Sequence, residues 1–175
     1  MSDDFPNRQT IRLPGYDYSE NGYYFVTVCS HGMEQIFGEI INGKMVLNDV
    51  GEMIKMVWFS LPKHHVVKLD EFQIMPNHIH FVLILLGSGA KNNESGGSRP
   101  APTIGTIIGL FKSTCSKQIH DLVGARRASP VSIKQKQIFQ RNYYEHIIRN
   151  EREYKQIVYY IRNNPQNWEN DRNYV

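Results

Sequence analysis

The sequence predicts an α+β sandwich in which an antiparallel sheet carries helices on one face, with a C-terminal helix in addition. Strand-like and helical segments follow one another in the order β, hairpin, α, β, β, α, β, α, and two strands are adjacent in sequence, as antiparallel partners often are. A chain of 175 residues with 41% hydrophobic residues is also long enough to bury one core. We therefore expect a single domain, 1–175.

Three strands are expected near the beginning of the chain. Segment 22–30 is rich in β-branched and aromatic residues, as strands are. Segment 36–48 is predicted to form a hairpin that turns at Asn42-Gly43, because this residue pair tolerates the positive φ angles of a tight hairpin turn.

A helix is expected after the hairpin. Asn48 or Asp49 can cap its first turn, and Pro62 stops it. Its apolar residues recur at helical spacing. They are Val50, Met53, Ile54, Val57, Trp58 and Leu61.

Two further strands occupy the middle of the chain. Segments 66–75 and 78–85 are both strand-like and are separated by Pro76-Asn77. The following stretch, 87–102, is rich in Gly, Ser and Asn, and its composition predicts a flexible insert.

The second half of the chain is expected to form helix, strand and helix. Segment 103–122 has a helical pattern, and a basic loop at 124–136 leads to the strand-like segment 138–148. Segment 150–164 is predicted to be a capped helix that ends before a proline.

The composition argues against a membrane protein or a disulfide-rich protein. No run of about 18 or more apolar residues is present, and the N-terminal "MSDDFPNRQT" is acidic and polar where a signal peptide would be basic and then apolar. Cys29 and Cys115 form no CxxC unit, so we expect buried free thiols and no Cys-rich zinc site. These observations favour a cytoplasmic protein.

Two histidines at the start of segment 78–85 are the first candidate for a functional site. Because side chains alternate along a strand, His78 and His80 should project side by side from one face. Neutral imidazoles at this spacing can chelate one divalent metal, although two satisfied structural histidines are the alternative. His146, in the strand beside the basic loop, stays open as a further candidate.

The C-terminal helix offers a nucleophile. Tyr160 and Asn164 lie one turn apart on the flank of its apolar stripe, whereas Tyr159 points away from that stripe. From the helical geometry alone, Tyr160 is more simply explained as an amphipathic boundary residue. Asn164 is equally well explained as the residue that ends the helix before Pro165.

Basic residues are concentrated in the second half of the chain. The segment from Pro102 to Arg149 contains eight basic residues and only two acids, Asp121 and Glu145, whereas the whole chain carries a net charge of +3. Local positive potential suits a polyanion, but the charge alone is explained more simply by a solvated loop. The basic residues are Lys112, Lys117, Arg126, Arg127, Lys134, Lys136, Arg141 and Arg149.

These features together resemble a known family. His78-Ile79-His80 looks like the HUH motif (two histidines flanking a large hydrophobic residue) of single-tyrosine DNA transposases. The segment "YYEHIIRNEREYKQIVYYIRNNP" resembles their tyrosine helix. The similarity extends over nearly the whole chain and is greatest to REP-associated tyrosine transposases. It includes "RLPGYDYSENGYYFVTVCS", "FGEIINGKMVLN", "MPNHIHFVLIL", "GTIIGLFKS" and "FQRNYYEHIIRNE".

The resemblance implies a ferredoxin-like fold and a role for each motif residue. Tyr160 would be the nucleophile, His78 and His80 would bind Mg²⁺ or Mn²⁺, and Asn164 would be the third ligand. It leaves open whether the tyrosine helix serves its own metal site or that of a partner in a homodimer. Basic and aromatic residues of the second half of the chain would contact DNA, the cations through phosphates and the aromatic rings by stacking on bases. They are Lys112, Lys117, Arg126, Arg127, Lys134, Lys136, Arg141, Tyr143 and Tyr144.

The implied activity is the cleavage and rejoining of hairpin-bearing single-stranded DNA through a 5′-phosphotyrosine intermediate. Two alternatives remain. A non-catalytic hairpin-binding protein would keep the fold and the basic surface. A metal-dependent phosphodiesterase that activates water would keep the histidines without needing Tyr160.

Overall fold

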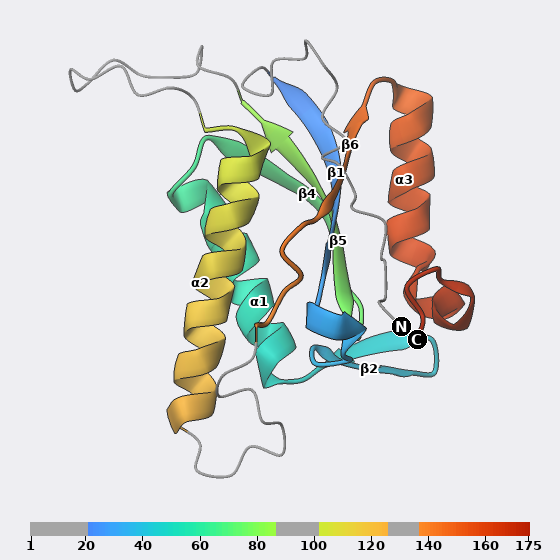
Figure 1. Ribbon diagram of the computed structural model, residues 1–175. Helices are drawn as coiled ribbons and strands as arrows, with labels where there is room; N and C mark the ends of the chain where they lie inside the picture. The colour runs from blue at the N-terminus through green and yellow to red at the C-terminus, as the bar shows by residue number, and fades with distance from the viewer. Residues whose placement is uncertain (1–20, 87–101, 126–136) are drawn as a thin grey trace, which may run out of the picture.

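The computed structural model describes residues 21–86, 102–125 and 137–175. Strands and helices alternate along the chain (Figure 1). The elements are β1 (Gly22–Cys29), β2 (Gly38–Ile41), β3 (Lys44–Leu47), α1 (Asp49–Ser60), β4 (Val67–Ile74), β5 (His78–Leu85), α2 (Ile104–Ala125), β6 (Tyr144–Ile148) and α3 (Glu151–Asn163). Short 3₁₀ turns include η1 (His31–Met33), η2 (Leu61–Lys63) and η5 (Pro165–Asn170).

Four strands form an antiparallel sheet in the order β4-β5-β1-β6. The two central strands, β5 and β1, are paired over their full length, from Gly22 opposite Leu85 to Cys29 opposite His78. The hairpin β2-β3 forms a separate two-stranded sheet. The predicted α+β class with an antiparallel sheet is therefore confirmed.

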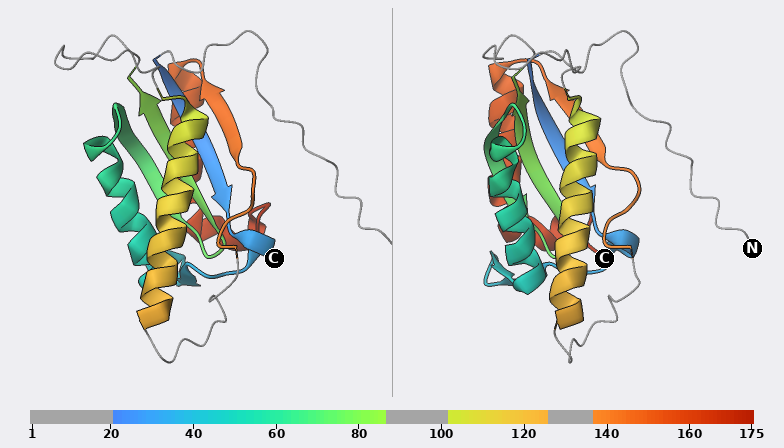
Figure 2. Two further views of the ribbon diagram at one scale, coloured as in Figure 1. Left: turned by 60° about the vertical axis from the view of Figure 1, so that its left-hand side comes forward. Right: turned by 90° about the vertical axis from the view of Figure 1, so that its left-hand side faces the viewer.

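Helices lie on both faces of the sheet. Helices α1 and α2 cover one face, and α3 lies alone on the other (Figures 1 and 2). The alternation along β5 follows this division, because Phe81 and Leu83 pack in the large core with α1 and α2, while Val82 packs with Ile161 of α3. Both histidines of β5 therefore belong to the α3 face, as the strand pattern predicted.

The hairpin turn and the cap of α1 lie where the sequence predicted them. Asn42 and Gly43 both have positive φ angles, of 52° and 71°, in the turn between β2 and β3. The Asn48 side chain caps α1 by accepting hydrogen bonds from Val50 N and Gly51 N. Asn48 and not Asp49 is thus the capping residue.

The predicted strand 138–148 is shorter than expected. Phe139 forms only an isolated bridge with Ser30, and β6 begins at Tyr144. The ammonium of Lys112 binds the backbone carbonyls of residues 140, 141 and 142. These carbonyls point to α2, which explains why the segment before β6 is not paired in the sheet.

The other boundaries agree to within a few residues, and α2 extends to Ala125. The insert at 87–102, apart from residue 102, and the basic loop beyond residue 125 lie outside the described residues. Cys115 is buried, Cys29 is half-buried, and both are free thiols. Among the helices that the structure describes, none is long and apolar enough to cross a membrane.

Candidate metal and tyrosine site

His78 and His80 lie side by side at the start of β5, and both are fully buried. Their Nε2 atoms are 2.9 Å apart and face one another. The outer nitrogens also have partners: His78 Nδ1 lies 2.8 Å from Asn77 Oδ1, and His80 Nδ1 lies 2.9 Å from Thr27 Oγ1. Contacts of this kind hold imidazole rings in a fixed orientation.

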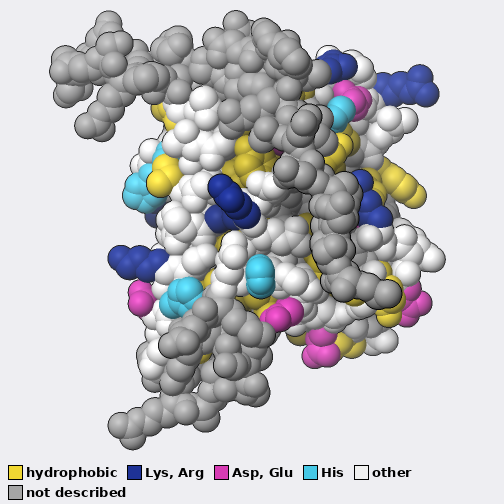
Figure 3. All heavy atoms as spheres, viewed as in Figure 1, with side chains coloured by type: hydrophobic (Ala, Val, Ile, Leu, Met, Phe, Trp, Pro, Cys, Tyr) yellow, Lys and Arg dark blue, Asp and Glu magenta, His cyan; other side chains and the backbone are white. Residues whose placement is uncertain are grey.

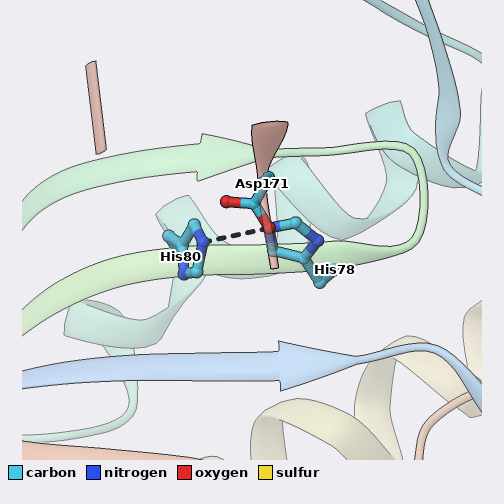
Figure 4. A group of neighbouring side chains, drawn as sticks. All are labelled: His78, His80 and Asp171. Carbon is cyan, nitrogen blue, oxygen red and sulfur yellow. Dashed lines mark hydrogen bonds between the residues drawn. The ribbon is translucent and has the colours of Figure 1, made fainter. Parts of the chain in front are cut away.

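Asp171 completes a cluster with the two histidines (Figure 4). One ligand atom from each of the three side chains lies within 4.8 Å of the others, so this group could hold a metal ion. Asp171 directly follows η5, whose buried Trp168 packs against His78 with ring centroids 5.8 Å apart. The C-terminal segment therefore brings a carboxylate to the strand.

The sequence analysis missed Asp171. More than ninety residues separate it from the histidines in sequence, so no local spacing relates the two parts of the cluster. The one available signal was the acid in the polar segment after the predicted tyrosine helix. That signal is weak, because exposed acids are common after helices.

Tyr160 projects from α3 into the same cluster. Its hydroxyl donates to Asp171 Oδ2 at 2.8 Å and lies 3.2 Å from His80 Nε2. Its side chain is 36% exposed, whereas that of Tyr159 is 71% exposed. The helical phase that separated the two tyrosines in the sequence therefore agrees with their places in the structure.

Asn164 lies one turn after Tyr160 and is 2% exposed. Its Nδ2 donates to Asp171 Oδ2 at 2.6 Å. Its Oδ1 is buried and has no hydrogen-bond partner among the described residues. A buried acceptor without a partner is costly, and a bound cation would satisfy it, so the residues at this site fit a metal ion.

Burial determines the charge states of the histidines. Desolvation lowers the pKa of His78 to about 4, although nearby Asp171 acts in the opposite direction. Desolvation and the neighbouring His78 lower the pKa of His80 well below its usual value. Both imidazoles are therefore neutral at pH 7, the state in which they can donate a lone pair to a metal.

The pKa values of Tyr160 and Asp171 are shifted in opposite directions. Burial and the hydrogen bond to Asp171 raise the pKa of Tyr160. Burial opposes the charge on Asp171, but hydrogen bonds from Asn173 N, Asn164 and Tyr160 outweigh it and lower the pKa of the carboxyl group. Without a metal, the site therefore holds a neutral phenol that donates to a carboxylate.

A cavity of about 500 Å³ opens beside Tyr160. Phe25, Tyr144 and Asn164 are among its lining residues, together with Arg172. The Arg172 guanidinium lies 5.3 Å from the centroid of the Tyr144 ring. Arg172 is a second residue that sequence reasoning missed. It places a cation beside the Tyr144 ring, in the cavity that Tyr160 also lines.

Among the predicted DNA-binding residues that the structure describes, Tyr144 lies on the other face of the sheet from the rest. Lys117 is exposed on α2, across the sheet from Tyr144, which faces α3. Lys112, Arg141 and Tyr143 line another cavity, of about 410 Å³, between α2 and the segment before β6. In the view of Figure 3, the Lys and Arg side chains of the described residues stand apart from one another. Arg126, Arg127, Lys134 and Lys136 lie outside the described residues.

Two further sequence candidates have structural partners. The Lys112 ammonium is bound to three backbone carbonyls, so its charge serves the fold. His146 Nε2 lies 2.6 Å from Glu153 Oε1, which joins β6 to α3. His146 is not a member of the His78–His80–Asp171 cluster.

Comparison with known sequences relates the chain to a bacterial protein of similar length. An uncharacterized protein of Haemophilus influenzae strain Rd is 38% identical over an alignment of 182 positions. The alignment covers 97% of this chain and 94% of that protein. The chain belongs to the same family as this Haemophilus protein. No protein-family model matches the sequence.

Two solved structures have a similar fold. A REP-associated tyrosine transposase bound to a REP hairpin has a TM-score of 0.56 and 18% identity, over 94% of this chain and 76% of that one. A candidate transposase from Deinococcus radiodurans R1 has a TM-score of 0.50 and 14% identity, over 87% of this chain and 95% of that one. At such identities the likeness shows the fold alone, which is the fold that the HUH resemblance implied.

Proposed function

We propose that this protein is a metal-dependent transposase that cleaves and rejoins single-stranded DNA, with Tyr160 as its nucleophile. The observation that carries the proposal is the direct contact of the Tyr160 hydroxyl with two members of the metal cluster, Asp171 and His80. A boundary tyrosine of purely structural use has no need of these partners. Tyr160 lines a cavity of about 500 Å³, and this cavity is where we place the DNA strand.

His78, His80 and Asp171 would hold the metal, with the unpartnered Oδ1 of Asn164 as a further ligand. Imidazole nitrogens combined with carboxylate and amide oxygens form a borderline donor set that accepts Mn²⁺ as well as Mg²⁺. When bound, either ion stabilises negative charge on the oxygens of the scissile phosphate. Sequence analysis assigned the third ligand to Asn164 alone, and Asp171 is now proposed in addition.

Asp171 has a second use as the acceptor of the tyrosine proton. Its Oδ2 already accepts the hydrogen bond of the Tyr160 hydroxyl. As the phenol oxygen attacks phosphorus, the proton passes to this carboxylate, the Tyr160 Oη–P bond forms, and the bond from phosphorus to the 3′ oxygen breaks. The leaving 3′ oxygen takes up a proton. Because a phosphodiester is conserved, a 3′ hydroxyl can later attack the phosphotyrosine and rejoin the strand.

The proposed substrate is single-stranded DNA next to a hairpin. The HUH resemblance implies it, and the REP-associated tyrosine transposase of similar fold is bound to a REP hairpin. In this chain, Tyr144 and Phe25 line the cavity beside the nucleophile, where an unpaired base can stack on an aromatic ring.

The test is the capture of a covalent adduct. The protein is incubated with Mn²⁺ and hairpin-bearing oligonucleotides from its genomic flanks, and denaturation-resistant protein–DNA species are separated. Tyr160→Phe should abolish the adduct, and the matched variant Tyr159→Phe should retain it, since Tyr159 faces solvent. Cleavage that persists in Tyr160→Phe without an adduct would favour a water-activating phosphodiesterase. Tight binding without cleavage in the wild type would favour a hairpin-binding protein.

A further inference from the structure

Asn77 is a buried side chain whose polar atoms are all in use. It lies between β4 and β5, with no exposed surface. Its Nδ2 donates to the backbone carbonyls of Met33, at 3.2 Å, and Asn173, at 2.8 Å. Because carbonyl oxygens can only accept, these two contacts fix which end of the amide is nitrogen. Oδ1 is therefore the atom that faces His78 Nδ1, at 2.8 Å.

This contact determines the tautomer of His78. An amide oxygen only accepts, so the hydrogen between the two atoms belongs to His78 Nδ1. A neutral imidazole with its hydrogen on Nδ1 has its lone pair on Nε2. That atom is the one that faces His80 and Asp171.

His80 has a less restrictive partner. The Thr27 hydroxyl beside its Nδ1 can either donate or accept, so it permits both tautomers. Without a metal, an Nε2–H of His80 can donate to the lone pair of His78 Nε2 across their 2.9 Å contact. With a metal, Thr27 can accept from Nδ1–H and leave both Nε2 lone pairs for the ion.

Asn77 is also connected to Asp171. The carbonyl of Asn173 accepts from Asn77, and the N–H of the same residue donates to Asp171 Oδ1 at 2.7 Å. The third contact of Asn77, to Met33, ties the segment after β1 to the same point. One buried amide thus joins β5 to the C-terminal segment that supplies the carboxylate.

We infer that Asn77 is a positioning residue of the metal site, which fixes the tautomer of His78 and holds the segment that carries Asp171. The inference rests on the proposed function in so far as the cluster binds a metal. It adds a residue that neither touches the DNA nor binds the ion, and it explains why a polar side chain is fully buried at this turn.

Two substitutions separate the two halves of this role. Asn77→Ala and Asn77→Asp both remove the N–H donors to Met33 and Asn173, but only Asn77→Asp keeps an acceptor beside His78 Nδ1. Ser30→Ala is the matched control, because the Ser30 hydroxyl is buried at the same corner and donates to Glu34 O, without contact to either histidine.

Two measurements are made on each protein. Long-range ¹H–¹⁵N NMR of the metal-free protein reports which nitrogen of His78 carries hydrogen, and calorimetry reports the affinity for Mn²⁺. We expect an Nδ1–H signature in the wild type, in Ser30→Ala and in Asn77→Asp. Ser30→Ala should bind Mn²⁺ as the wild type does, whereas Asn77→Asp should bind with intermediate affinity, because it keeps the acceptor for His78 but loses the donors that hold the segment with Asp171. In Asn77→Ala the signature should be lost and the affinity should fall roughly 10- to 100-fold, as for other partners of metal-bound histidines.

An Asn77→Ala protein that keeps both the Nδ1–H signature and the wild-type affinity would overturn the inference. An Asn77→Asp protein without the Nδ1–H signature would overturn its tautomer half, and an Asn77→Asp protein with full wild-type affinity would overturn its segment half. If Asn77→Ala does not fold, the wild type decides, since hydrogen on His78 Nε2 contradicts the assignment. If the wild type binds no Mn²⁺, the metal part of the proposed function fails, and the NMR signature alone decides the role of Asn77.

Discussion

Acidification should destabilise the metal-free protein, because His78 is buried as a neutral imidazole. Its pKa is about 4 in the folded protein, against 6.5 for an exposed histidine. Between these values the unfolded chain binds a proton that the folded protein does not. The free energy of unfolding is therefore at its full value above pH 6.5 and falls as the pH decreases toward 4.

The size of the effect follows from the two pKa values. One pKa unit corresponds to about 1.4 kcal/mol, so His78 contributes about 3 kcal/mol, most of which is lost by pH 4.5. His80 is shifted in the same direction and adds to the loss. Against a typical domain stability of about 5–15 kcal/mol, this is a large fraction.

Urea unfolding in the presence of a chelator measures this loss. The free energy of unfolding is determined at pH 7 and at pH 4.5 for the wild type, for His78→Gln and for His64→Gln, whose histidine is exposed. Other groups also titrate over this range, so the difference between variants is the relevant quantity. His78→Gln should lose roughly 2–3 kcal/mol less than the wild type, and His64→Gln should behave as the wild type. Equal losses in all three proteins would refute the buried neutral histidine.

Three further outcomes test the site. Asn164→Ala should weaken Mn²⁺ binding by at least about tenfold in calorimetry, and an unchanged affinity, alongside loss of binding in His80→Ala, would exclude Asn164 as a ligand. A mixture of Tyr160→Phe and His80→Ala proteins should form no DNA adduct, because Tyr160 contacts His80 of its own chain, whereas restored activity would show a tyrosine helix shared between copies. Thr27→Val should lower the free energy of urea unfolding by about 1–3 kcal/mol by removing the partner of His80 Nδ1, and a change near zero would mean that this nitrogen finds another partner.

Much of the fold was predictable because its signals are local. The Asn-Gly turn, the cap at Asn48 and the alternation along β5 depend on residues a few positions apart. The start of the strand predicted at 138–148 could not be found from local signals. It depends on Lys112, which binds carbonyls of a segment nearly thirty residues away. Hydrophobic pattern alone continues through that segment and gives no reason for the strand to begin at Tyr144.

The candidate site divides in the same way. The histidine pair follows from strand alternation, and helical phase distinguishes Tyr160 from Tyr159. Asp171 and Asn77 could not be assigned, because their roles arise only when the C-terminal segment folds back onto β5. The predicted basic surface stays a prediction, because a charge count along the chain does not say on which face of the sheet each residue lies, and four of its basic residues lie outside the described residues.

The place of Tyr160 depends on polar contacts more than on a large apolar interface. Helix α3 packs against the sheet through a small cluster that contains Phe25, Val82 and Ile161. Near its start Tyr154 donates to Asp70 at 2.8 Å, and further along it Arg162 pairs with Glu71. The register shift of β4 lies between Leu69 and Phe72, at these two acids, so an irregularity of the strand coincides with the attachment of the helix. These contacts, together with those of Tyr160 and Asn164 to Asp171, seat the tyrosine helix on the sheet of its own chain. Within the described part of the chain, the proposed nucleophile, the proton acceptor and the metal ligands thus lie in one cluster.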